Sequence, residues 1–267
     1  MRSLGDPEVA VAAAEAGAAV VRRKYGEVHT YLAKSATDFA TDADIEAEQA
    51  ILDLLRDARP DDGFVGEESG TSGPPSDRTW LVDPLCGTLN FAARTPLVAV
   101  NVALREGADV HVAAAAEPFS GEIFWTDGRS ARVRREGGDE QLVPSPVTRL
   151  VDINLDGRAS RALGLLADGE FRARFGPRVL STSLGLAWVA AGRRAAYVTE
   201  GTVRDSVHFA AGIALCEAAG CVVTDLDGGP LRAGAGLLAA ADGYTHSALL
   251  AILDRSHVTT RTVGTRP

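Results

Sequence analysis

The sequence has few cysteines, almost no lysine and no long apolar segment. Its three cysteines, Cys86, Cys216 and Cys221, are an odd number without paired spacing. This count argues against a disulfide framework and favours free thiols in the cytoplasm. The sequence contains no apolar run long enough to span a membrane and no signal-peptide pattern at its start, so neither an anchor nor export is expected. The net charge of −9 argues against a nucleic-acid or anionic-membrane partner, because like charges repel.

The chain is long enough, at 267 residues with 46% hydrophobic residues, to bury a sizeable core. Apolar spacing and capping residues predict helices over 6–24 and 42–58. Strands are expected over 97–104 and 110–115, and a β-meander over 119–135. After a connection over 138–148, strands and helices alternate, including a helix over 206–219. This alternation predicts a layered α/β fold. We expect one unit over 1–267, with subregions 1–140 and 141–267.

Two short sequence segments contain most of the candidate site residues. The first places Glu67 and Glu68 directly after a probable strand, and the second ends a strand with Asp83 and continues into a Gly87-Thr88 turn. A carboxylate supplies hard oxygen to a divalent cation, and an open turn supplies N–H donors to a phosphate. Cys86 introduces a soft thiol into this otherwise hard-oxygen pattern.

The two strings resemble the inositol monophosphatase family, whose pattern is Gly-Glu-Glu followed by Asp-Pro-Ile/Leu-Asp-Gly-Thr-x-Asn-Phe. Further matching segments follow in the family's order: 34–44, 94–100, 186–193, 209–220 and 221–231. The resemblance implies a five-layer αβαβα sandwich, a homodimer and a small phosphorylated or polyol-like substrate. It also implies Mg²⁺-dependent phosphomonoesterase chemistry.

The resemblance carries three sets of roles onto this chain. The first set would hold one magnesium ion: Glu67, Asp83 and the backbone carbonyl of Leu85. The second would position the attacking water: Glu67, Thr88 and Asp38. The third would hold phosphate oxygens with N–H groups: Gly87 and Thr88. The alternative interpretation is that Asp83 caps a turn and the two glutamates face solvent.

The second magnesium position of the family has lost its carboxylates in this sequence. Cys86 stands where the family has an aspartate. In the later motif, His208 or Val207 stands at the metal aspartate's position, depending on which end of the helix anchors the alignment; Asp205 reaches it only if the helix start shifts. A thiol is a poor ligand for magnesium. The sequence therefore predicts at most one Mg²⁺, with zinc or no metal as alternatives.

Three explanations compete for this altered position. One is a weakened phosphatase that uses one magnesium ion. Another is a repurposed enzyme in which Cys86 and His208 form a nucleophilic dyad, or hold zinc together with Asp83 and Glu67. The third is a pseudoenzyme that binds a ligand or partner. A plain alternative is that Cys86 fills space and His208 is a partly buried helix residue.

The substrate region is less informative. Ser181 and Thr182 occupy the loop where the family has Gly-Ser near substrate hydroxyls, and Glu200 lies within one residue of a family glutamate that contacts polyols. An exposed turn is the alternative interpretation for Glu200. We predict a divergent member of this family, with ordinary phosphatase activity weakened, lost or repurposed, and with a role in specialised metabolism. The competing predictions are a functional phosphatase for inositol, sugar or histidinol phosphates and a non-catalytic binding protein.

Overall fold

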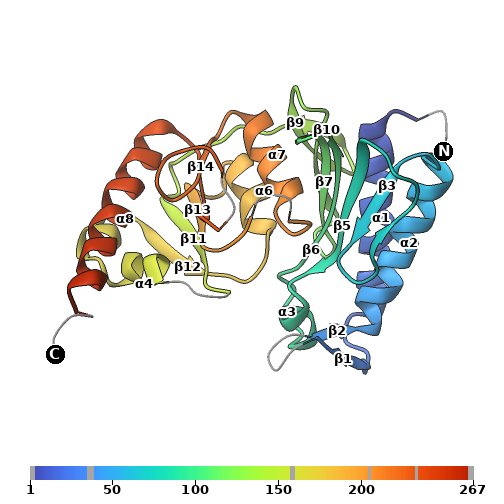
Figure 1. Cartoon of the computed structure of the whole chain (residues 1–267), viewed down its shortest axis with the longest axis horizontal. Coiled ribbons are helices and arrows are strands. Elements are labelled where there is room, and N and C mark those ends of the chain that lie inside the picture. The colour runs from blue at the N-terminus through green and yellow to red at the C-terminus, as the bar shows by residue number, and fades with distance from the viewer. Residues whose placement is uncertain (1–3, 35–38, 157–159, 204–205, 232–233, 264–267) are drawn as a thin grey trace. The chain divides into compact units, whose positions relative to one another are not determined.

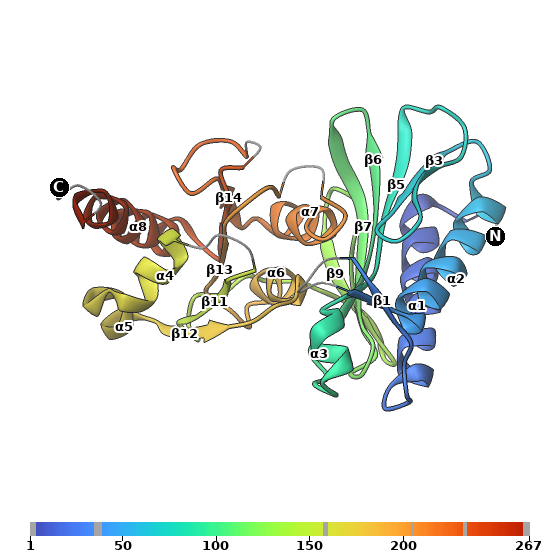
Figure 2. The same cartoon turned by 60° about the horizontal axis from the view of Figure 1, so that its bottom comes forward.

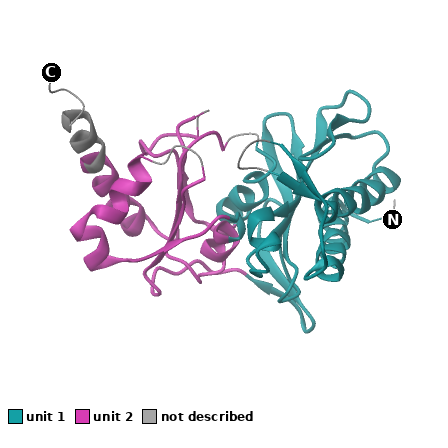
Figure 3. Cartoon of the chain, turned by 90° about the horizontal axis from the view of Figure 1, so that it is seen from below, with its two compact units in different colours: residues 1–141, 182–184, 205–218 teal, residues 142–181, 185–204, 219–267 magenta. Residues whose placement is uncertain are grey.

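The computed structural model describes residues 4–34, 39–156, 160–203, 206–231 and 234–263, with side chains described up to residue 255. The chain divides into two compact units, which are described separately (Figure 3). Unit 1 contains residues 1–141, 182–184 and 205–218, and unit 2 contains residues 142–181, 185–204 and 219–267. The prediction that all 267 residues act as one unit stays a prediction.

Unit 1 is built on an eight-stranded sheet with the strand order β10-β9-β8-β7-β6-β5-β3-β4 (Figure 1). Its strands are β3 (Gly63–Gly66), β4 (Gly70–Ser72), β5 (Arg78–Cys86), β6 (Ala99–Glu106), β7 (Asp109–Glu117), β8 (Glu122–Thr126), β9 (Ala131–Arg135) and β10 (Gly138–Gln141). A separate ladder pairs β1 (Tyr31–Ala33) with β2 (Phe39–Thr41). The expected connection over 138–148 therefore begins with an edge strand, β10.

Two helices cover one face of this sheet, α1 (Asp6–Lys24) and α2 (Asp42–Ala58), at the bounds predicted from the sequence (Figure 2). Pro7 opens α1, and three basic residues close it, which suits the helix dipole. In α2, Thr41 caps the helix in a capping box with Asp44. Their apolar stripes pack on Trp80, Val82 and neighbouring strand residues.

The opposite face of the sheet receives α7 (Ala210–Ala219), which begins later than the expected residue 206. Ala210, Ala211 and Ala214 pack against Leu81 and other small strand residues in one apolar cluster. Small side chains let the helix lie close to the sheet. The three residues before α7 form a turn, so His208 and Val207 are turn residues rather than helix residues.

Unit 2 contains a five-stranded sheet with the order β12-β11-β13-β15-β14. Its strands are β11 (Leu150–Asn154), β12 (Gly176–Val179), β13 (Ala196–Thr199), β14 (Val222–Thr224) and β15 (Leu237–Ala240). Its helices are α4 (Ser160–Ala167), α5 (Gly169–Arg174), α6 (Leu184–Ala190) and α8 (Gly243–Val263). An apolar core joins α4, α5 and α8 to strands β11, β13 and β15.

The predicted layered α/β class is confirmed, because each unit stacks helices on a sheet. All three cysteines are free. In the described part of the chain, none of the helices combines the length and apolar character needed to cross a bilayer.

Candidate active site

The site lies where the pairing between β3 and β5 ends in unit 1. These strands pair in parallel, with Gly66 opposite Val82 as the last pair. The following residues, Glu67 after the end of β3 and Asp83 within β5, therefore lie next to each other. The backbone N–H of Glu67 donates to the Val82 carbonyl at 3.0 Å and fixes this register. Two carboxylates that are separate in sequence are thus brought together.

An irregularity in β5 directs the side chains of Asp83 and Cys86 toward the same region of the site. In a regular strand, Asp83 and Cys86 would point to opposite faces, because side chains alternate with a period of two. The pairing of β5 with β6 shifts between these two residues, and such a bulge changes side-chain direction. Asp83 is fully buried, accepts the Leu85 N–H at 3.2 Å and accepts the Asn101 side-chain amide at 3.3 Å.

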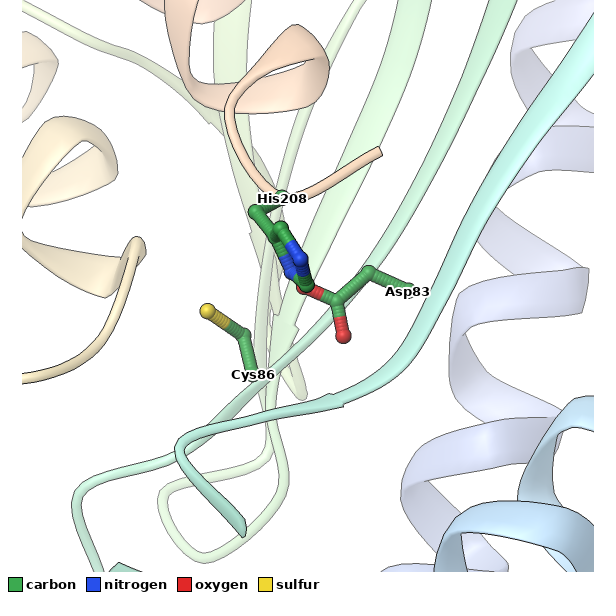
Figure 4. A group of neighbouring side chains, drawn as sticks. All are labelled: Asp83, Cys86 and His208. Atoms are coloured by element: carbon green, nitrogen blue, oxygen red, sulfur yellow. The ribbon is translucent and has the colours of Figure 1, made fainter. Parts of the chain in front are cut away.

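The bulge lets Asp83, Cys86 and His208 converge, as Figure 4 shows. One ligand atom from each lies within 4.8 Å of the others. His208 Nδ1 is 2.9 Å from Asp83 Oδ2 and 3.8 Å from Glu67 Oε2. The backbone N–H of Ser183 donates to Cys86 Sγ at 3.2 Å. We call the residues Asp83, Cys86 and His208 the mixed-donor cluster.

The packing of α7 explains why His208 is the residue that reaches Asp83. Val207 packs into the apolar cluster between α7 and the sheet, whereas the His208 side chain remains 42% exposed beside Asp83. Of the two residues that the sequence left open, His208 is the one whose side chain lies beside Asp83. Asp205, the third possibility, and Asp38 lie outside the described residues.

Burial and charge give this site a strong preference for a cation. Burial and the neighbouring Asp83 raise the pKa of Glu67 to about 8. Glu67 Oε2 is buried and accepts no hydrogen bond from the described residues. Burial opposes protonation of His208, but hydrogen bonds with Asp83 and Cys86 raise its pKa to about 12. An orphaned carboxylate oxygen beside a second carboxylate is suited to a positive charge.

The same electrostatics count against a nucleophilic thiolate. Burial and the charge of Asp83 raise the pKa of the Cys86 thiol, and these effects outweigh its hydrogen bonds with His208 and Ser183. A reactive cysteine needs a lowered pKa, because the thiolate is the nucleophile. The raised pKa of the Cys86 thiol therefore disfavours a Cys86–His208 nucleophilic dyad.

The residues that the resemblance assigns to magnesium fit a hard cation. Glu67 Oε2 accepts no hydrogen bond from the described residues, and Asp83 lies next to it in the adjacent strand. The Leu85 carbonyl lies 3.2 Å from the Thr88 hydroxyl, and its two lone pairs leave one free when Thr88 donates to it. Three oxygen donors of this kind match what magnesium takes from proteins, which is few protein ligands and several waters.

Asp44 is a site residue that the sequence reasoning did not identify. Its Oδ1 accepts the Thr88 hydroxyl at 2.9 Å, while its Oδ2 accepts the Thr41 N–H at 2.8 Å and the Thr41 hydroxyl at 2.6 Å. The prediction named Asp38 behind Thr88, and the described contact is made by Asp44. The available signal was the Thr-x-x-Asp spacing of Thr41 and Asp44 at the start of α2, where the structure forms a capping box.

Two further charged residues brace the Glu67 turn. Lys34 Nζ donates to Glu67 Oε1 at 2.9 Å and to Glu68 Oε1 at 2.6 Å. Glu48, which is buried, accepts the backbone N–H groups of Glu68 and Ser69 at 2.8 Å each. These contacts fix the turn that carries the Glu67 side chain. No local pattern linked Glu48 to this turn, because the two are joined only by the tertiary fold.

The phosphate turn has the backbone conformation that the sequence suggested. Gly87 adopts a left-handed conformation with φ of 108°, which glycine reaches without strain. It precedes the short helix α3 (Thr88–Ala92), whose Phe91 N–H donates to the Gly87 carbonyl. Its role in phosphate binding stays a prediction.

The predicted substrate residues lie in different places. Thr182 belongs to unit 1, where it is buried and its hydroxyl donates to the Cys86 carbonyl at 3.3 Å. Ser181 and Glu200 belong to unit 2. The Ser181 hydroxyl bonds Asp156, and Glu200 Oε1 accepts the Ala162 N–H at 2.8 Å near the start of α4. Thr182 and Glu200 thus have structural contacts, and their substrate roles remain untested.

The fold and the adjacent carboxylates of Glu67 and Asp83 describe an α/β protein with a candidate divalent-cation site. The model of the inositol monophosphatase family matches residues 7–257, and the chain belongs to this family. It is 35% identical over 235 residues to an inositol-1-monophosphatase of Caulobacter vibrioides, covering 81% of this chain and 88% of that protein. It is 31% identical to the Nus factor SuhB of Pasteurella multocida, and the match covers 87% of this chain and 90% of that protein.

A solved structure agrees with this assignment. The extragenic suppressor protein SuhB of Bartonella henselae is similar with a TM-score of 0.82 and 30% sequence identity, over 92% of this chain and 97% of that one. The fold type implied by the resemblance is therefore confirmed. Family membership also agrees with phosphatase chemistry on a phosphorylated small molecule and with a general dependence on Mg²⁺.

Proposed function

We propose that this protein hydrolyses a phosphomonoester of a small polyhydroxylated molecule, with one magnesium ion held by Glu67, Asp83 and the Leu85 carbonyl. The observation that carries the proposal is the buried Glu67 Oε2, which accepts no hydrogen bond from the described residues, beside the buried Asp83 of the neighbouring parallel strand. Carboxylates buried together are costly unless a cation neutralises them. A bound magnesium ion would supply charge stabilisation and a water of lowered pKa.

The chain's own groups orient the water. Asp44 accepts the Thr88 hydroxyl proton, so the lone pairs of Thr88 Oγ1 are free to accept a hydrogen bond from a water molecule. Glu67 provides a second acceptor for that water. The water oxygen forms a bond to phosphorus while one water proton passes to Glu67, and the ester P–O bond breaks. The leaving alkoxide takes up one proton in exchange, so the products are the alcohol and hydrogen phosphate. The N–H groups of Gly87 and Thr88 hold the phosphate oxygens during this exchange.

We propose that this chain differs from its family at the second cation position, where Cys86 and His208 replace the family's carboxylates. This replacement removes hard oxygen ligands, so we expect a lower rate with magnesium alone than a full carboxylate set would give. Removal of one electrostatic stabiliser commonly costs a factor of about 10²–10³. A homodimer and a cytoplasmic location remain proposals that follow the family resemblance.

The test is phosphate release with magnesium from a panel of inositol, sugar, nucleotide and histidinol phosphates. The comparison uses Asp83→Asn and the matched control Asp53→Asn, which removes an exposed carboxylate on α2. We expect turnover of at least one ester, a loss of about 10²-fold or more in Asp83→Asn, and no change in the control. Turnover that survives Asp83→Asn would refute the assigned site. If the folded protein released no phosphate from any ester of the panel, a non-catalytic binding role would be supported instead.

A further inference from the structure

The mixed-donor cluster offers one sulfur, one nitrogen and one oxygen ligand around a single point. Magnesium rarely accepts sulfur or imidazole, whereas zinc is bound by Cys, His and Asp side chains in four-coordinate sites. We infer that Cys86, His208 and Asp83 form a zinc site at the second cation position, adjacent to the magnesium position. The inference concerns metal identity and does not depend on the proposed phosphatase activity.

The spacing of the donors suits a tetrahedral ion. Bonds of about 2.0–2.3 Å place the donor atoms of a tetrahedral zinc site roughly 3.3–3.8 Å apart. In the cluster the three donor atoms lie within 4.8 Å of one another, and His208 Nδ1 is already 2.9 Å from Asp83 Oδ2. Side-chain movements on the order of 1 Å would therefore complete the site. Three protein ligands leave a fourth position for water or a substrate oxygen.

A second layer of contacts holds the donors in place. Ser183 donates its N–H to Cys86 Sγ at 3.2 Å, and Asn101 donates its amide to both Ser183 Oγ at 2.8 Å and Asp83 Oδ2 at 3.3 Å. One buried amide thus connects the supports of two ligands. Hydrogen bonds of this type orient ligands and tune the metals that they bind. A space-filling cysteine would not require a donor aimed at its sulfur.

Charge also favours a divalent ion at this position. Asp83 belongs to the cluster, and Glu67 Oε2 lies 3.8 Å from His208 Nδ1. Two carboxylates therefore lie at the position that the ion would occupy, and carboxylates attract a doubly charged ion.

The experiment uses the full chain, stripped of metal with a chelator and titrated with Co²⁺ as a spectroscopic probe for zinc. A cobalt–thiolate bond gives a charge-transfer band in the near ultraviolet. We expect this band in the unchanged protein and in the control Cys221→Ser, and its loss in Cys86→Ser. Zinc should remove the band stoichiometrically, and a large excess of Mg²⁺ should not.

Zinc affinity, measured by competition with a chromophoric chelator, gives the second readout. We expect Cys86→Ser and His208→Asn each to weaken zinc binding by at least about tenfold, and His111→Asn, an exposed control, to leave it unchanged. Absence of the cobalt–thiolate band, or equal zinc affinity in Cys86→Ser and the unchanged protein, would overturn the inference. Circular dichroism checks that each variant is folded. Because no outcome is read from turnover, failure here leaves the phosphatase proposal standing, and the reverse also holds.

Discussion

Asp44→Asn tests whether Asp44 orients the Thr88 hydroxyl. The carboxylate receives three hydrogen bonds, two from Thr41 and one from Thr88. Asparagine keeps the shape of the side chain but offers one acceptor oxygen and an NH₂ donor. If the oxygen continues to serve Thr41, the NH₂ group faces Thr88. The hydrogen bond then reverses, and the Thr88 hydroxyl accepts where it previously donated.

Asp44→Asn should have a small effect on stability and a large effect on kcat, so the two effects can be distinguished. Loss of a hydrogen bond to a charged group costs about 1.5–3 kcal/mol, but burial raises the pKa of Asp44, so a neutral side chain relieves part of the cost of burying the charge. We therefore expect a net destabilisation on the order of 1 kcal/mol, which shifts Tm by about 2–4 °C in a protein of this size. A misdirected water-positioning hydroxyl should reduce kcat by about 10²-fold.

The assay is steady-state phosphate release with the best ester of the panel, with thermal unfolding measured in parallel. KM should change little, because the phosphate N–H donors are untouched. Asp42→Asn is the matched control, since Asp42 lies in the same turn of α2 and pairs with Lys24 and His29, outside the site. A normal kcat in Asp44→Asn, or an equal loss in both variants, would refute the role given to Asp44.

Two predictions concern stability. A Cβ on Gly66 would lie 2.6 Å from the Glu48 carboxylate, so Gly66→Ala should lower the free energy of unfolding by about 1–3 kcal/mol in a urea titration. The control is Gly137→Ala, which has open space at Cβ and should cost under 1 kcal/mol. Equal losses in both variants would contradict the close contact between Gly66 and Glu48. Burial raises the pKa of Asp6, but two arginine hydrogen bonds outweigh it and hold the pKa below its ordinary value. A lowered folded pKa stabilises above the unfolded pKa of about 3.9 and the gain is lost as pH falls through the folded value. Asp6→Asn should therefore destabilise at pH 7 and have little effect at about pH 2; a loss of similar size at both pH values would exclude this ion-pair network as its cause.

Local signals predicted the parts of the fold that depend on neighbouring residues. The bounds of α1 and α2 agree with the sequence prediction, because Pro7 and the Thr41 cap mark where these helices begin. Strand β10 was taken for a connection, since Gly138–Gln141 is polar and fully exposed and forms a strand only by pairing with β9. Helix α7 begins at Ala210 rather than at 206, because the preceding turn directs His208 toward Asp83.

The candidate site divides in the same way. Glu67, Asp83 and the Gly87 turn were visible in two contiguous sequence segments, because Glu67 follows β3 directly and Asp83 and Gly87 lie in and directly after β5. Asp44 and Asn101 were not visible, since their roles arise from contacts with Thr88 and Asp83 across the fold. The alignment of the α7 segment also could not decide between Val207 and His208. Packing decides it, because only one of two adjacent turn residues can face the sheet while the other faces the site.

The convergence of Cys86 and His208 argues against independent loss of two metal ligands. A lost ligand leaves no reason for its replacement to be a metal donor or to point at the old site. Here both replacements are metal donors and both point at Asp83. Moreover, the Cys86 sulfur receives a backbone N–H from Ser183, and hydrogen bonds of this kind orient metal ligands. The bulge in β5 and the turn before α7 bring the three donors together, which is the arrangement that the proposed zinc site requires.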